Sequence, residues 1–189
     1  VMASNCCESG AFLSSGPGSE VPEIELITHF QTFGPEGEVD IEVSLVAPRS
    51  RGRVTVNPRD VFGPPLVDPN FLAEGRDVLA LQEGVGRVQS IASRRALREF
   101  PLLEETSPAS RARSEDGLRE AIFQTATTAY HPCGSCAMGH ALDADLRVRG
   151  MENLWVADAS AMPTVPTGNI ACAVVVLGEK ASDLILNAV

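Results

Sequence analysis

Two runs of alternating apolar residues near the start of the chain limit the folds that it can adopt. In residues 23–33 and again in residues 39–46, apolar side chains recur at every second position or in short β-branched blocks, which is typical of strands. A Gly-Pro-Glu-Gly sequence at 34–37 separates the runs and favours a turn. The pattern predicts a β-hairpin, and residues 53–56 predict a third short strand, giving an antiparallel sheet with one face to bury.

After the predicted strands, the apolar residues are spaced as in helices. Asp68, as N-cap, and Pro69, at the first helical position, predict a helix that runs to about Ala96. A second helix is predicted to open at Ser114 and to end near Tyr130. Composition predicts an exposed connection over 1–20 and a surface loop over 102–114. The spacing of apolar residues predicts short strands over 146–148 and 154–157 and an apolar helix over 170–186.

The charge balance excludes several classes of partner. The 189 residues carry 25 acidic and 15 basic side chains, a net charge of -10, which opposes binding to nucleic acid or to anionic lipid. The longest strongly apolar stretch, residues 170–177, is far shorter than the roughly 20 residues of a membrane span. Five cysteines, an odd number, favour a reducing, cytoplasmic compartment. Because the chain starts Val-Met-Ala without a leader sequence, we expect it to be part of something larger.

Two histidines and two cysteines fall within residues 131–140 and allow more than one interpretation. His131, Cys133, Cys136 and His140 would make four zinc ligands, but they would have to fold around the ion within a single loop. A thiol-exchange role for the two cysteines is weaker still, because the pair does not open a helix after a strand. We favour no metal here, with small residues that allow close backbone packing. His131 differs: Pro132 restricts its backbone, and a held imidazole suits general-base catalysis.

Residues 154–170 form the second segment whose residues could bind a cofactor or take part in catalysis. A predicted strand ends in Asp158, a loop with two prolines follows, and a helix begins after Gly168-Asn169. Backbone N–H groups and a helix N-terminus then lie together, an arrangement that suits a negatively charged cofactor group. In the alternative interpretation, Asn169 is only an N-cap. The Gly84-Val85-Gly86 sequence lacks the third glycine of a dinucleotide fingerprint and lies inside a helical pattern.

Taken together, four linked segments resemble the C-terminal part of glucose-methanol-choline (GMC) flavoprotein oxidoreductases. They occur in the family's order and cover nearly the whole chain: Pro48–Val54 with Pro65–Leu72, His131–Gly139, Val148–Ser160, and Pro163–Asn169. The resemblance implies an α/β protein with an α+β substrate domain, built on an antiparallel sheet, and elements of a Rossmann-like FAD domain. Residues 1–140 are then expected to belong to the substrate-binding domain and residues 141–189 to the FAD-binding domain.

The same resemblance implies a cofactor, site residues and a reaction. His131 matches the family's active-site histidine, and Asn169 matches a second active-site position that is His or Asn. Asp158 and Ala159 match the segment near the FAD pyrophosphate and ribityl chain, while Gly168, Asn169 and Ile170 match the segment at the isoalloxazine edge. The implied activity is oxidation of a primary or secondary alcohol to an aldehyde or ketone. Hydride passes to flavin N5, His131 takes the hydroxyl proton, and Asn169 hydrogen-bonds the alkoxide.

Partners and alternatives follow from that implication. The expected partners are an N-terminal portion of the same enzyme that carries the Gly-rich fingerprint, a small alcohol, and dioxygen or another electron acceptor. One alternative is a non-redox member of the family that cleaves cyanohydrins, like a hydroxynitrile lyase. A second is a small metal-binding or interaction module built on the segment from His131 to His140, and a third is a partner subunit that has lost catalysis.

Overall fold

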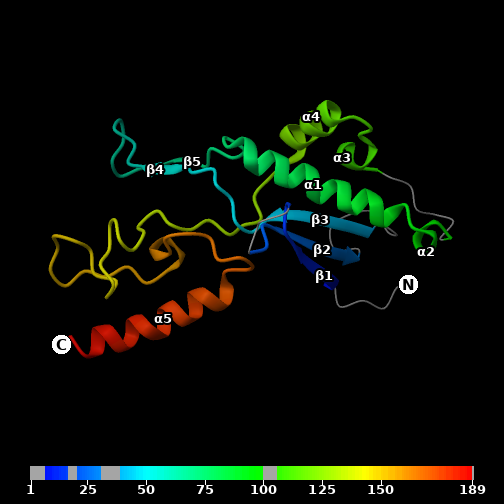
Figure 1. Cartoon of the computed structure of the whole chain (residues 1–189). Helices are drawn as coiled ribbons and strands as arrows, with labels where there is room; N and C mark the ends of the chain where they lie inside the picture. Colours follow the sequence, from blue (N-terminus) through cyan, green and yellow to red (C-terminus); the bar gives the residue numbers. More distant parts are fainter. Residues whose placement is uncertain (1–6, 17–20, 31–38, 100–105, 189) are drawn as a thin grey trace. The chain divides into compact units, whose positions relative to one another are not determined.

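The computed structural model describes residues 7–16, 21–30, 39–99 and 106–188 (Figure 1). The chain forms two compact units. The first contains residues 1–50 and 72–127, and the second contains residues 51–71 and 128–189. Helices and antiparallel strands occur together, which confirms the predicted mixed fold class.

The first unit is built on a three-stranded antiparallel sheet in the order β1-β2-β3. The predicted hairpin is confirmed as β2 (Ile24–Phe30) and β3 (Val39–Leu45), which pair from Ile24–Leu45 to Phe30–Val39; its turn lies outside the described residues. The prediction of an exposed connection over residues 1–20 is wrong at residues 7–13, which form β1 (Cys7–Leu13) against β2, although most of β1 is exposed. Residues 1–6 and 17–20 lie outside the described residues. Leu13 packs against the buried core of the unit, and this contact helps to hold β1 on the sheet.

Residues 53–55 are a strand, as predicted, but they do not join that sheet. This strand, β4 (Arg53–Thr55), pairs with β5 (Leu66–Asp68) in a separate two-stranded sheet of the second unit. Gly52 precedes β4, and a Cβ atom there would lie 2.2 Å from the carbonyl oxygen of Asp68. The chain therefore needs glycine at 52, because the backbone after β5 passes this close to it.

The first helix, α1 (Gly75–Ala92), begins later than predicted. Asp68 ends β5 instead of capping a helix, and Asn70 and Leu72 have positive φ angles of 50° and 58°, which exclude a helix there. Glu74 is the N-cap, and a short helix, α2 (Arg95–Arg98), follows α1. Gly84 lies inside α1, as predicted, and a Cβ atom there would lie 2.5 Å from Val43 Cγ1, so glycine lets the helix approach the sheet.

Apolar burial between α1 and the sheet forms the core of the first unit. Ile24 and Leu26 of β2 are buried with Ala80 of α1, and Val43 and Leu45 of β3 pack against them. Two further helices, α3 (Pro108–Arg111) and α4 (Glu115–Thr125), complete the unit. The N-cap at Ser114 is confirmed, since its Oγ accepts the Gly117 N–H at 3.1 Å. The predicted loop over 102–114 is wrong at α3, and its first four residues lie outside the described residues.

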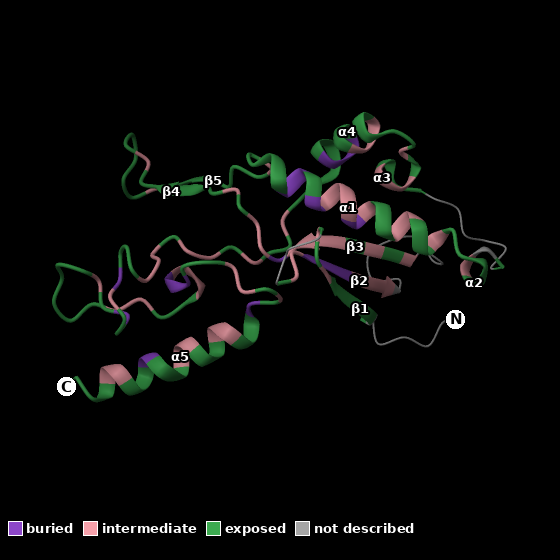
Figure 2. Cartoon of the chain, viewed as in Figure 1, coloured by how far each residue is buried: buried purple, intermediate pink, exposed green. Residues whose placement is uncertain are grey.

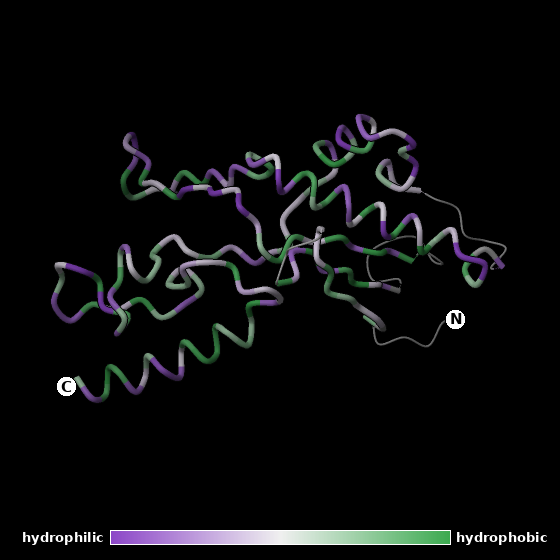
Figure 3. Tube along the Cα trace, viewed as in Figure 1, coloured by the Kyte–Doolittle hydropathy of each residue, from purple (hydrophilic) through white to green (hydrophobic). Residues whose placement is uncertain are grey.

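The second unit contains few regular elements. The predicted C-terminal helix is confirmed as α5 (Ala171–Leu186), in which apolar residues predominate (Figure 3). The strands predicted at 146–148 and 154–157 are wrong: this region forms only the isolated bridges Leu142–Val148 and Arg147–Trp155. Leu142, Leu146, Ala161 and Ala181 make a small core (Figure 2). Across the described ranges, no helix combines the length and apolarity that membrane crossing requires.

Candidate active site

His131 and Asn169, 38 positions apart in the sequence, meet in the second unit. His131 Nε2 lies 2.5 Å from Asn169 Oδ1. His131 is half-buried and Asn169 is exposed. Because an amide oxygen only accepts hydrogen bonds, this contact is a hydrogen bond in the tautomer that carries its proton on Nε2. The two residues that were predicted separately as catalytic candidates are thus hydrogen-bonded partners.

Main-chain hydrogen bonds hold the loop that follows His131. The N–H groups of Gly134, Cys136 and Met138 donate to the carbonyl oxygens of Ala159, Ser160 and Ala161, at 3.2, 2.9 and 2.9 Å. Every second residue of one segment thus bonds to consecutive residues of the other. Gly134 has φ of +87°, in the region that favours glycine. His131 is therefore attached, through Pro132 and this ladder, to the short 3-10 helix η1 (Ala159–Ala161).

Asn169 lies in the turn that leads into α5. Gly168, with φ of +153°, donates its N–H to Pro166 O at 2.7 Å. The interpretation of Asn169 as only an N-cap is wrong, since the N-cap is Ile170. The apolar side chain of Ile170 cannot accept a hydrogen bond, so it leaves the first-turn N–H groups of α5 uncapped. This helix end carries partial positive charge.

Asp158 and Ala159, the other predicted cofactor-binding residues, lie at the start of η1. Asp158 is the N-cap of η1, and its Oδ1 accepts from Ser160 N at 2.8 Å and from Ser160 Oγ at 2.5 Å. Ala159 accepts the Gly134 N–H. These contacts fix the shape of the loop, in which Asp158 is exposed and Ala159 is half-buried.

The cysteines near His131 do not form a metal centre with it in the described residues. Across those ranges, no group of three or more His, Cys, Asp or Glu side chains is arranged to hold an ion. Burial raises the pKa of the Cys133 thiol above its ordinary value, while the nearby positive charge of Arg51 acts to lower it. The neutral thiol is therefore the favoured form at neutral pH, as expected of a packing residue.

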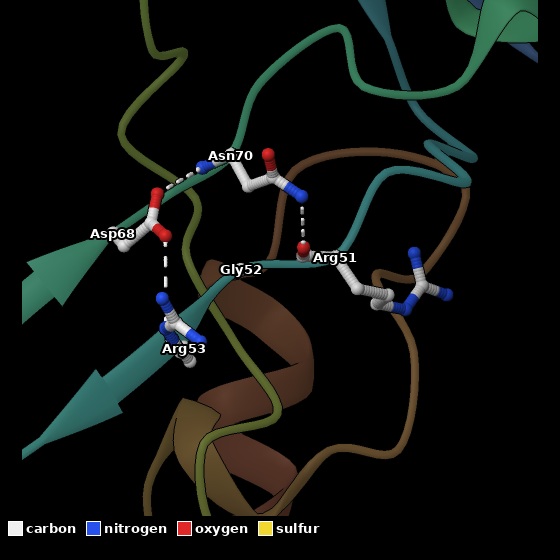
Figure 4. Close-up of a pocket in the computed structure, with 5 residues that line it drawn as sticks. All are labelled: Arg51, Gly52, Arg53, Asp68 and Asn70. Carbon is white, nitrogen blue, oxygen red and sulfur yellow. Dashed lines mark hydrogen bonds and ion pairs between the residues drawn. The ribbon is translucent and has the colours of Figure 1, made fainter.

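Sequence reasoning missed a small polar cavity between β4 and β5. It has a volume of about 270 Å³ and is lined by Arg51, Gly52, Arg53, Asp68 and Asn70 (Figure 4). Asp68 accepts the Asn70 N–H at 3.1 Å and lies 3.7 Å from Arg53 Nε, while Asn70 Nδ2 donates to Arg51 O at 2.9 Å. The only signal in the sequence was that both strands fall in segments that resemble the GMC family.

The comparisons with known proteins identify the class. The GMC oxidoreductase C-terminal family matches residues 48–178. Over 98% of its length, the chain is 34% identical to an uncharacterised GMC-type oxidoreductase of Mycobacterium bovis. It is 30% identical, over its full length, to an alcohol dehydrogenase (acceptor) of Pseudomonas putida. The chain belongs to the GMC oxidoreductases, a family of FAD-dependent flavoenzymes, as its motifs predicted.

A solved structure agrees with this assignment. Formate oxidase of Aspergillus oryzae, described in work on FAD modification, superposes with a TM-score of 0.75 at 28% identity, covering 90% of this chain and 32% of that one. The chain spans 38% of the length of the mycobacterial relative and 36% of that of the Pseudomonas relative. The chain therefore corresponds to about a third of a GMC oxidoreductase.

Proposed function

We propose that the protein containing this chain oxidises a primary or secondary alcohol to an aldehyde or ketone, with FAD as the cofactor. The observation that carries the proposal is the 2.5 Å contact between His131 and Asn169, in a chain that belongs to the GMC oxidoreductases. In the same proposal, residues 1–140 belong to the substrate domain and residues 141–189 to the FAD domain. An N-terminal portion of the enzyme completes the cofactor site.

The residues at the start of α5 suit a flavin. Its first-turn N–H groups are not capped by Ile170, and a helix N-terminus stabilises negative charge. Gly168, with its positive φ, adds no side chain beside that turn. Gly168, Asn169 and Ile170 would therefore lie at the flavin ring edge, and the Asp158–Ala159 backbone near the ribityl chain and pyrophosphate. When bound, FAD supplies a hydride acceptor at N5.

In this proposal, His131 and Asn169 both act on the hydroxyl group of the substrate. The contact between His131 and Asn169 is too short for a substrate oxygen to lie between them, so the incoming oxygen replaces it. In the substrate complex we assign His131 the tautomer with its proton on Nδ1, so that the Nε2 lone pair takes the hydroxyl proton as the alkoxide forms. Asn169 cannot act as a base, but its amide N–H donates to the developing oxyanion.

Stopped-flow measurement of flavin reduction tests this function. Under anaerobic conditions, alcohols should bleach the flavin absorbance of the purified FAD-loaded protein, whereas a cyanohydrin lyase would leave the flavin oxidised. His131→Ala should slow reduction by about 100-fold or more, the usual size of general-base effects, and should retain bound FAD. His140→Ala, an exposed histidine in the same segment, is the matched control and should reduce at the normal rate. Equal rates for His131→Ala and the parent would refute the assignment.

A further inference from the structure

A cysteine, a histidine and a glutamate form a line of contacts across the sheet of the first unit. Cys7 Sγ of β1 lies 3.3 Å from His29 Nδ1 of β2, and His29 Nε2 lies 3.2 Å from Glu42 Oε2 of β3. The thiol, imidazole and carboxylate therefore follow one another through both ring nitrogens of His29.

The strand register explains why these residues meet. Cys7 is directly opposite His29, and His29 is opposite Asp40, two positions before Glu42 on the same face. The neighbouring positions Ile41 and Val43 point toward α1 and the core. Because side chains alternate along a strand, Cys7, His29 and Glu42 lie on the face of the sheet that is opposite α1.

Each member of the line is placed for proton transfer. Glu42 fixes the ring of His29, and Ser44 Oγ in turn donates to Glu42 Oε1 at 2.5 Å. Cys7 is exposed, and the His29 and Glu42 side chains are 25% and 42% exposed. A thiol whose proton can pass to an oriented imidazole becomes a thiolate, the nucleophilic form.

The geometry argues against a metal site at these residues. The two ring nitrogens of His29 face Cys7 and Glu42 on opposite edges of the ring, so one ion cannot contact all three side chains. The described part of the chain accordingly shows no His, Cys, Asp and Glu group that would hold an ion. The arrangement is that of a nucleophile, a base and an orienting carboxylate.

We infer that Cys7 is a modification site, activated by His29 and Glu42, that reacts with small neutral hydroperoxides. The charge of the surface favours this class of oxidant. Glu42 belongs to the line, Asp40 lies opposite His29 beside it, and the chain carries a net charge of -10, which disfavours anionic oxidants such as charged disulfides. A peroxide also needs no oxyanion site, so an open sheet face suffices. This inference is independent of the alcohol oxidation proposed above.

The step balances within these groups and the peroxide. Cys7 Sγ gives its proton to His29 Nδ1, and the thiolate attacks one peroxide oxygen. A sulfur–oxygen bond forms as the oxygen–oxygen bond breaks. The leaving hydroxide of hydrogen peroxide, or the alkoxide of an organic hydroperoxide, takes the proton from His29 and departs as water or an alcohol. Sulfur is oxidised by two electrons to a sulfenic acid, and the peroxide is reduced by two electrons.

Peptide mass spectrometry after hydrogen peroxide treatment and dimedone trapping tests the inference. The purified FAD-loaded protein carries Cys6→Ser to remove the neighbouring thiol, and a synthetic peptide with a single cysteine, added to the same solution, serves as the reference thiol. We expect Cys7 to be oxidised about tenfold faster than the cysteine of the reference peptide, since an ordinary thiol is only a few per cent ionised at pH 7. His29→Gln should reduce this ratio to about one, and Glu42→Gln should reduce it in part.

A second measurement keeps the test decisive if a variant fails to fold. The ratio of the Cys7 rate to the rate of the reference peptide is measured in the parent protein before and after unfolding in guanidinium, which separates the three strands. A ratio that falls to about one on unfolding supports activation by the fold. A native ratio already near one, or a ratio that His29→Gln leaves unchanged, overturns the inference.

Discussion

Asp77 Oδ2 accepts two hydrogen bonds from Ser50, one from its backbone N–H at 2.8 Å and one from its hydroxyl at 2.6 Å. Asp77 is 3% exposed and lies in the first turn of α1. Its other oxygen accepts the Arg49 N–H at 2.8 Å. One buried carboxylate therefore fixes the chain immediately before residues 51–71 leave the first unit.

Replacing this carboxylate should destabilise the protein. Asp77→Ala removes a buried carboxylate that accepts three hydrogen bonds from Arg49 and Ser50, which typically costs about 2–4 kcal/mol. Asp116→Ala, an exposed residue in the first turn of α4, is the matched control and should cost less than about 1 kcal/mol. Urea unfolding followed by circular dichroism measures both. Equal losses in the two variants would show that the contacts of Asp77 add nothing.

A pair of glycine substitutions separates close approach from helix propensity. Gly52→Ala puts a methyl group 2.2 Å from the Asp68 carbonyl oxygen, so the β4–β5 pair must open and the melting temperature should fall. Gly86→Ala, in α1, has nothing within 4 Å of the added atom, and it should be neutral or stabilise by up to about 1 kcal/mol. Differential scanning calorimetry compares them; an unchanged melting temperature for Gly52→Ala contradicts the close approach.

The pH dependence of Cys133 alkylation tests its surroundings. Burial raises the pKa of this thiol and Arg51 opposes the rise, so Arg51→Gln should raise the pKa further and slow reaction with iodoacetamide at pH 9. Arg53→Gln, which removes the charge paired with Asp68, is the control and should leave the rate unchanged. Because the folded-state pKa is raised, the contribution of Cys133 to stability is present below pH 9 and is lost as the pH rises above it. Faster alkylation in Arg51→Gln would contradict this account.

The role of Asn169 is tested by removing its amide. Asn169→Ala should slow flavin reduction about tenfold, because a hydrogen bond to a forming charge is worth about 1.5 kcal/mol or more. This effect is smaller than that of His131→Ala, which removes the base. Asn187→Ala, at the opposite end of α5, is the control and should reduce at the parent rate. Parent-like reduction in Asn169→Ala would restrict this residue to a structural role.

Local sequence patterns correctly predicted the elements whose signals lie within one short stretch of the chain. The hairpin, the Ser114 cap and helix α5 each depend on period and end signals within a short window. The errors come from pairing between distant segments. Nothing within residues 7–13 indicates that they pair with β2. Asp68-Pro69 carries a strong helix-start signal, which is overridden because Asp68 of β5 pairs with Arg53 of β4.

In the candidate site, too, local features could be predicted from the sequence and contacts between distant segments could not. Each residue type and its local backbone could be predicted, as with the proline after His131 and the glycine before Asn169. Their 2.5 Å contact could not, because it depends on two loops brought together by long-range main-chain bonds. The Cys7–His29–Glu42 line was also missed, since it spans three strands whose register is set by the burial of residues on the opposite face.

The ladder that joins the His131 loop to η1 uses backbone N–H and carbonyl groups alone. Most side chains along that stretch therefore take no part in the attachment, with three constraints. Proline at 134, 136 or 138 has no N–H to give, the φ of +87° at 134 favours glycine, and Met138 packs against the core of the second unit. Positions 135 and 137 carry no such demand. Libraries that diversify the surroundings of His131 can therefore vary this loop widely and still leave the imidazole anchored.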